Sequence, residues 1–64
     1  MKKENILTYR DVETILTALA QRALDERERA EKAENDGEND TAAYHNQQAA
    51  ECSRVISRLR GFIF

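Results

Sequence analysis

Residues 34–40 of the chain read Glu34-Asn35-Asp36-Gly37-Glu38-Asn39-Asp40, the most polar stretch in the sequence. On either side of it, apolar and small residues recur at intervals of three and four, which is the spacing of one helix face. The two faces align antiparallel about a midpoint between Gly37 and Glu38, because facing residue numbers have a constant sum. The pairs are Val12 with Ile63, Leu16 with Leu59, Leu19 with Ile56, Ala23 with Cys52, Glu26 with Ala49, Ala30 with His45, and Ala33 with Ala42.

This pattern predicts an all-α fold, an antiparallel hairpin with helices over about 9–34 and 41–60. Residues 1–64 then form a single helical-hairpin domain. Its remaining parts are an N-terminal arm over 1–7, a loop over 35–40 and an apolar C-terminal tail over 61–64.

The start of the first helix carries two independent signals. Thr8 and Asp11 have the spacing of a capping box, in which the side chain of each binds the backbone N–H of the other. Leu7 and Val12 have the spacing of a hydrophobic staple, a contact that sets the angle at which the chain enters the helix. We therefore expect the first helix to begin near Tyr9.

The other helix ends are marked by glycines and by short polar side chains. Gly37 can supply the left-handed residue that ends the first helix, at about Ala33 or Glu34. The second helix should be capped by Asp40 or by Thr41, between which the sequence does not choose.

The second helix is expected to end near Arg60, with Gly61 as the left-handed residue after it. Phe62 would then pack back on Ile56.

The chain has more apolar surface than a two-helix hairpin can cover. A chain of 64 residues buries only about 60% of its unfolded surface, and one cysteine excludes an internal disulfide. Apolar residues left off the paired faces widen the apolar surface of each helix; they are Ile15, Ala20, Leu24, Val55, Phe62 and Phe64.

These observations predict a homodimer or larger assembly, most simply a four-helix bundle of two hairpins. The expected interface residues are Val12, Ile15, Leu16, Leu19, Val55, Ile56, Leu59 and Phe62. Ile15 and Val55 should lie on the face between subunits.

Charge is unevenly distributed along the chain. The whole sequence carries 10 basic and 12 acidic residues, a net charge of -2, which implies no general attraction to nucleic acid. Residues 25–49 hold three basic and eight acidic side chains, a net charge of −5, whereas the other residues hold seven and four, a net charge of +3. The folded hairpin should have an acidic loop end and a mildly basic terminal end.

The run from Arg22 to Lys32 places opposite charges four residues apart and is expected to be a solvated helix face. Glu26 is the exception, because it falls on the paired face opposite Ala49. Its carboxylate could meet Arg22, Gln48 or a second chain and fix the register or oligomeric state. It could equally stay hydrated near the thin end of the hairpin.

No metal, cofactor or catalytic site is expected. A calcium loop centred on Gly37 would need carboxylates where the chain has Lys32 and Ala43. His45 and Cys52 lie seven residues apart on one face, roughly 10 Å, so a single ion cannot bind both within one chain. A symmetric site formed by two copies stays open. Ser53, Ser57 and Cys52 have no base close enough for activation.

Arg54 and Arg58 form a basic stripe on the outer face of the second helix, and Arg10 lies at the same end of the hairpin. Like charges four apart repel weakly, so the stripe could bind a phosphate, a nucleotide or RNA. It could also be an ordinary solvated face.

The sequence has no secretory signal, because Met1-Lys2-Lys3-Glu4-Asn5 is followed by only two apolar residues. No run approaches the ~18 apolar residues that span a bilayer, so no membrane association is expected. A lone Cys52 is typical of a reducing compartment, which favours the cytoplasm.

The predicted layout resembles that of the Rop-type RNA-binding hairpins, which dimerise. The segments Glu13-Thr14-Ile15-Leu16-Thr17-Ala18-Leu19 and Arg27-Glu28-Arg29-Ala30-Glu31-Lys32-Ala33, followed by a glycine-containing acidic loop and an alanine-rich return, resemble small helical proteins of phages and prophages. That resemblance implies action by binding, either blocking a host or defence protein or sequestering a signalling nucleotide.

Together these features predict a non-enzymatic, oligomeric helical binding protein whose partners are itself and another protein. The alternative is an oligomer that sequesters a nucleotide or binds RNA through Arg10, Arg54 and Arg58.

Overall fold

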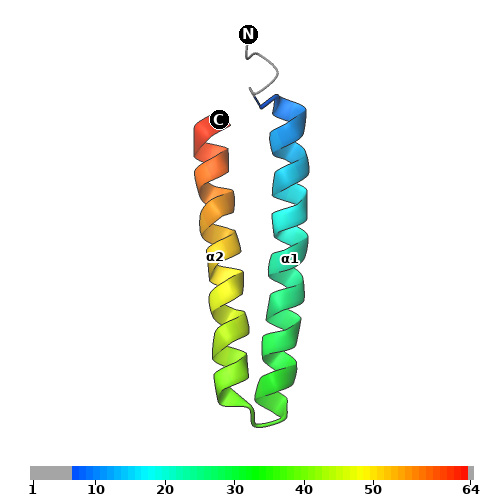
Figure 1. The fold of residues 1–64 in the computed structure, drawn as a ribbon, viewed down its shortest axis with the longest axis vertical. Helices are drawn as coiled ribbons and strands as arrows, with labels where there is room; N and C mark the ends of the chain where they lie inside the picture. Colours follow the sequence, from blue (N-terminus) through cyan, green and yellow to red (C-terminus); the bar gives the residue numbers. More distant parts are fainter. Residues whose placement is uncertain (1–6, 64) are drawn as a thin grey trace.

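The structure is a computed structural model that describes residues 7–63, with the backbone alone described at 62 and 63. It contains two α-helices, α1 (Tyr9–Asn35) and α2 (Asn39–Ile63), which run antiparallel side by side (Figure 1). The start of α1 and the end of α2 lie at one end of the rod, and the loop lies at the other. The predicted helical hairpin is confirmed.

The predicted capping box closes the start of α1. The Asp11 N–H donates to Thr8 Oγ1 and the Thr8 N–H donates to Asp11 Oδ2, both at 3.0 Å. Two of the N–H groups that lack a partner inside the helix are thereby bonded. The staple residues differ in burial, since Val12 is buried while Leu7 is 55% exposed.

Gly37 ends α1, as the sequence predicts, and the backbone there forms a complete Schellman motif. Gly37 has a φ of 78°, the left-handed conformation that glycine adopts without strain. The Glu38 N–H donates to the Ala33 carbonyl at 2.8 Å, and the Gly37 N–H donates to the Glu34 carbonyl at 3.0 Å. The helix therefore extends to Asn35, slightly beyond the predicted end.

The predicted cap of α2 at Asp40 or Thr41 is wrong. The Glu38 carbonyl already accepts a bond from the Ala42 N–H at 3.0 Å, which makes Glu38 the residue that precedes the helix. Because Glu38 both completes the Schellman motif and starts α2, the connection needs only residues 36–38 instead of 35–40. Asp40 lies in the first turn, where its charge suits the positive end of the helix dipole.

The predicted end of α2 at Arg60 is also wrong, because the helix continues through Gly61 to Ile63. Gly61 does not have a positive φ, so it is an ordinary helical residue rather than a left-handed cap. Glycine tolerates the left-handed conformation but does not require it, and a helical glycine costs only about 1 kcal/mol. The expected contact of Phe62 with Ile56, and the place of Phe64, lie outside the described side chains.

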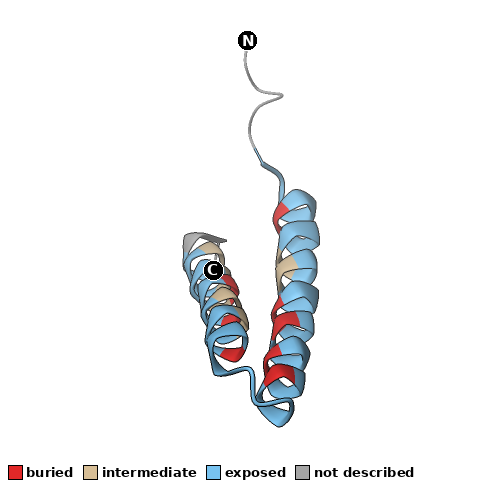
Figure 2. Ribbon diagram, turned by 60° about the horizontal axis from the view of Figure 1, so that its bottom comes forward, coloured by how far each residue is buried: buried red, intermediate tan, exposed pale blue. Residues whose placement is uncertain are grey.

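The paired faces of the two helices form the core. Buried residues line the sides that face each other (Figure 2). They are Val12, Ala23, Glu26, Ala30, Ala33, Ala42, Ala49 and Cys52. Leu16, Leu19, His45, Ile56 and Leu59 are partly buried, so every described position of the predicted pairing contributes to the core.

The helices lie closer together near the loop than near their other ends (Figure 1). Alanines occupy the paired positions near the loop, and their small side chains allow the backbones to approach. Leucine and isoleucine occupy the terminal half and hold the helices apart.

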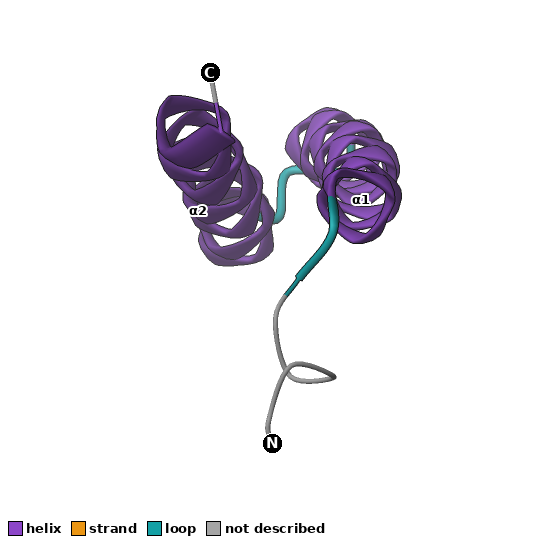
Figure 3. Ribbon diagram, turned by 90° about the horizontal axis from the view of Figure 1, so that it is seen from above, coloured by secondary structure: helices purple, strands orange, loops and turns teal. Residues whose placement is uncertain are grey.

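Seen along its length, the hairpin is one layer of two helices (Figure 3). Each helix has a single neighbour within the described residues, so much of its surface is open to solvent. None of the described residues larger than alanine, apart from Val12, Glu26 and Cys52, is classed as buried. The core is consequently thin.

Candidate functional site

A polar cluster interrupts the alanine-rich core near the middle of the hairpin. Glu26 is only 6% exposed, and its Oε1 accepts a hydrogen bond from His45 Nδ1 at 2.6 Å. Its Oε2 lies 3.5 Å from Arg22 Nε. Arg22 also donates to Gln48 Oε1 at 3.1 Å, which ties α1 to α2.

The sequence predicts Arg22 as one partner of the Glu26 carboxylate and, as an alternative, a carboxylate that stays hydrated. The contact with Arg22 is confirmed and the hydrated alternative is wrong. The contact with His45 was missed, because His45 was paired with Ala30. His45 lies one turn from Ala49, which is the residue opposite Glu26. The side chains of Glu26 and His45 are long enough to span that offset.

The environment of Glu26 favours its charged form. The hydrogen bond from His45 is the largest cause that lowers the pKa of Glu26 below its ordinary value, and Arg22 adds to the lowering. Burial acts in the opposite direction but is outweighed. Both carboxylate oxygens are engaged, so the cluster acts as a structural tie between the helices rather than as a reactive group.

His45 and Cys52, the candidate metal ligands, are not brought together. His45 is bonded to Glu26, whereas Cys52 is buried in the core. No group of three or more His, Cys, Asp or Glu side chains within the described residues could hold a metal ion.

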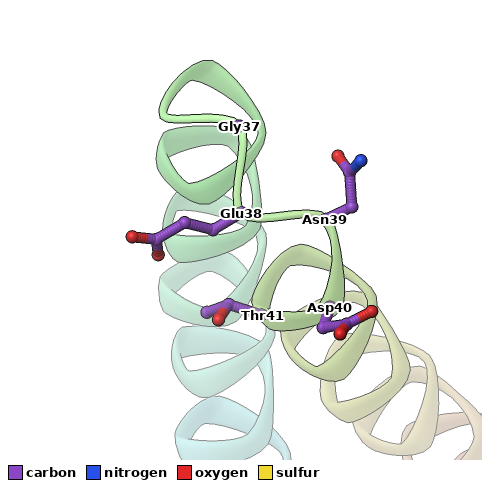
Figure 4. Close-up of a pocket in the computed structure, with 5 residues that line it drawn as sticks. All are labelled: Gly37, Glu38, Asn39, Asp40 and Thr41. Atoms are coloured by element: carbon purple, nitrogen blue, oxygen red, sulfur yellow. The ribbon is translucent and has the colours of Figure 1, made fainter.

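The loop end forms a shallow hollow lined by Gly37, Glu38, Asn39, Asp40 and Thr41 (Figure 4). The labelled side chains point in different directions instead of converging on one point. The connection is also far shorter than a calcium-binding loop of 12 residues. The hollow therefore lacks the converging oxygen atoms of a cation site, although it contains two carboxylates.

The arginines of the basic stripe differ in their contacts within the described residues. Arg54 donates to Glu51, its neighbour one turn earlier on α2. Arg10 and Arg58 are exposed near the terminal end of the rod, and neither guanidinium forms an ion pair with a described residue. The three arginines predicted to contact phosphate are thus separate surface groups, one of them already neutralised.

The residues predicted to form the subunit interface fall into three classes of burial. Val12 is buried inside the hairpin, whereas Leu16, Leu19, Ile56 and Leu59 are partly covered. Ile15 and Val55 are 37% and 36% exposed. The side chain of Phe62, the remaining predicted interface residue, lies outside those that the structure describes.

One side of the hairpin carries a groove of about 370 Å³ between the helices. Its lining comprises Leu19 and Arg22 of α1 together with Gln47, Gln48, Glu51, Cys52 and Val55 of α2. Ile15 lies one turn before Leu19 and so belongs to the same side of α1. We call the surface formed by Ile15, Leu19, Arg22, Gln48, Glu51 and Val55 the groove face.

The sequence pointed to Ile15 and Val55 but not to the polar members of the groove face. The signal was available, because Gln48, Glu51 and Val55 recur at intervals of three and four, as do Ile15, Leu19 and Arg22. It was missed because these residues are less apolar than the paired faces.

A second groove runs along another part of the surface. It is lined by Tyr9, Glu13, Leu16, Thr17, Ala20 and Arg60. Leu24, 57% exposed, continues the α1 side of this groove at helical spacing from Ala20. The hairpin therefore has two sides with apolar side chains open to solvent.

Neither helix carries an apolar run, within the residues described, that is long enough to cross a bilayer. Comparison with protein-family models, curated proteins and solved structures finds no match for this chain. Its function is therefore inferred from the hairpin itself.

Proposed function

We propose that this chain is a non-enzymatic binding protein that self-assembles into a helical bundle and recognises another protein. The observation that supports the proposal most directly is the groove face, where Ile15 and Val55 are exposed beside the partly buried Leu19. Aliphatic side chains at this position gain from contact with a second molecule, since burial of the exposed third of each adds about a third of the 1.5–3 kcal/mol of full burial, or about 0.5–1 kcal/mol.

The thin core is the second support for assembly. Among the described residues, alanine supplies five of the eight that are buried, and no large side chain is fully buried. Alanine contributes little hydrophobic free energy, and a hairpin of this size is marginally stable without a disulfide, a metal or a partner. Self-association supplies the missing burial.

Recognition of a further protein follows from the second groove. If assembly covers the groove face, the surface around Tyr9, Ala20 and Leu24 stays available on the outside of the bundle. A small helical protein of the phage or prophage type would use such a surface to block or modulate a host protein. The lone buried Cys52 is compatible with action in the reducing cytoplasm.

The mass in solution, measured by light scattering after size exclusion, tests the assembly. We expect the wild type to elute as a dimer or larger species, and Ile15→Glu or Val55→Glu to give monomers or unfolded chains. Leu24→Glu is the matched control, because it places a carboxylate on an equally apolar site away from the groove face. A folded Ile15→Glu variant with the mass of the wild type would contradict the proposal.

The alternative function, binding of a signalling nucleotide or RNA, uses Arg10, Arg54 and Arg58. Its support is the exposure of Arg10 and Arg58 at one end of the rod, and the pairing of Arg54 with Glu51 weakens it. Absorbance near 260 nm beyond that of two tyrosines in purified protein would favour it. Retention of that ligand by an Arg54→Glu/Arg58→Glu variant would exclude it.

A further inference from the structure

The two helices contribute residues to the groove face at matching levels along the rod. The bonds from Arg22 to Gln48 and from Arg27 to Ser53, at 3.1 and 3.3 Å, bracket the register, since their residue numbers add up to 70 and 80, on either side of the sum of 75 in the predicted pairing. In this register, Leu19 of α1 lies at about the level of Val55 of α2. Arg22 lies at about the level of Glu51.

We propose that the occupant of the groove face is a second copy of this chain, docked with both loops at the same end of the bundle. The two-fold axis then runs along the rod, and α1 of each copy packs against α2 of the other. This arrangement rests on the self-assembly proposed above and specifies its geometry.

In the proposed geometry, apolar residues of one copy face apolar residues of the other, and a basic residue faces an acidic one. A rotation about the long axis preserves levels, so Leu19 meets Val55 of the second copy and Arg22 meets Glu51 of the second copy. Arg22 already contacts Glu26 and Gln48 of its own chain, and Glu51 accepts a bond from Arg54, which holds both charges in the groove face. A guanidinium has five donors and a carboxylate about four acceptor sites, so each retains capacity for the second copy.

The same arrangement places exposed Tyr44 at the level of Arg29 of the second copy. Tyr44 lies one turn before Gln48, on the groove side of α2, and is 56% exposed. A guanidinium over a tyrosine ring is a favourable contact. Tyr44, an exposed aromatic side chain near the loop, thus also contacts the second copy.

The whole side of the hairpin that carries the groove face is large enough for a stable dimer. Each helix is about 40 Å long and about 10 Å wide, so the side of two helices presents roughly 800 Å². Stable protein–protein interfaces bury about 800 Å² on each partner. Full overlap of the two rods is needed to reach this value.

The opposite docking, with the loops at opposite ends, is less favourable. With full overlap it sets Arg22 near Arg22 of the second copy. It attracts the mildly basic terminal end of one rod to the acidic loop end of the other, but it leaves the apolar side chains of the terminal end against charged ones. With overlap of the apolar ends alone, it buries about half the area. The parallel dimer instead brings the two acidic loop ends together, but that repulsion is screened over a Debye length of about 8 Å at physiological salt.

The orientation can be measured with a spin label at the loop. A Glu38→Cys variant in a Cys52→Ala background carries one labelling site, on an exposed side chain in the connection between the helices (Figure 4). We expect a distance between the two labels below about 30 Å, which is roughly the width of four packed helices. A distance of about 40 Å or more, the length of one rod, would overturn the parallel arrangement.

Charge exchange tests the predicted contact between Arg22 and Glu51. Arg22→Glu and Glu51→Arg should each weaken dimerisation by about tenfold, since each changes two contacts per dimer. The double variant should return to within about threefold of the wild type. Circular dichroism of each variant establishes that the hairpin is folded. The contact would be overturned if the double variant dimerised as weakly as the single variants, or if the single variants dimerised as tightly as the wild type.

These outcomes are distinguishable from failure of the proposed function. A wild type that is monomeric by light scattering overturns both proposals. A wild-type dimer with a long distance between labels leaves the self-assembly intact and overturns only the arrangement.

Discussion

At the scale of single residues, the most informative position is Glu26, an acidic side chain within an alanine-lined core. Its burial is tolerated because His45 and Arg22 engage both carboxylate oxygens. A buried carboxylate without partners would be strongly destabilising. The cluster therefore ties the middle of α1 to α2 at one offset and excludes neighbouring offsets.

We predict that Glu26 makes the stability of the hairpin depend on pH. Its lowered pKa means that its contribution is present above the value of an unfolded glutamate, about 4.3, and is lost as the pH falls through the folded-state value. The advantage of the wild type over Glu26→Gln in urea denaturation should be present at pH 7 and shrink at pH 3. Glu28→Gln, on an exposed site of the same helix, is the control. An advantage that is unchanged at pH 3 would count against this role.

At the scale of secondary-structure elements, backbone signals determine where the helices begin and end. The capping box at Thr8 and the Schellman motif at Gly37 satisfy backbone groups that have no partner inside a helix. Gly61 does not have a left-handed backbone and forms no turn, so α2 continues beyond it. The two glycines thus have opposite roles.

Substitution of these glycines by alanine should have opposite effects. Gly37→Ala should destabilise the hairpin by about 1–2 kcal/mol, because a side chain at a φ of 78° is strained even in open space. Gly61→Ala should stabilise it by about 0.5–1 kcal/mol, since a Cβ there meets nothing within 4 Å and the residue is helical. Urea denaturation of both variants measures the effects, and destabilisation by Gly61→Ala would contradict a helical Gly61.

At the scale of the whole molecule, the hairpin has more apolar surface than one neighbour per helix can cover. Its buried core is mainly alanine, while Leu16, Leu19, Ile56 and Leu59 are only partly covered. Burial of Ile15, Leu19 and Val55 at a subunit interface would couple folding to assembly, as is common for small helical dimers.

Coupling of folding to assembly predicts a melting temperature that depends on protein concentration. Raising the concentration about a hundredfold should raise the melting temperature by several degrees, because mass action favours the folded dimer. Thermal unfolding followed by circular dichroism measures the change. The Ile15→Glu variant, where it folds, should show no such dependence. A melting temperature of the wild type that is independent of concentration would indicate a hairpin that is stable alone.

The sequence by itself determined the two helices, their antiparallel pairing, the start of α1 and the turn at Gly37. These features follow from periodic spacing and from short-range backbone bonds, and both are properties of neighbouring residues.

Only the tertiary structure showed that Glu26 contacts His45 and that three residues connect the helices. It also showed that Gly61 is helical and which residues form the groove face. Each depends on how far a side chain reaches across the core, or on one residue such as Glu38 serving two elements at once. Local spacing does not encode those distances, because they are set by how closely the alanine-rich helices approach each other.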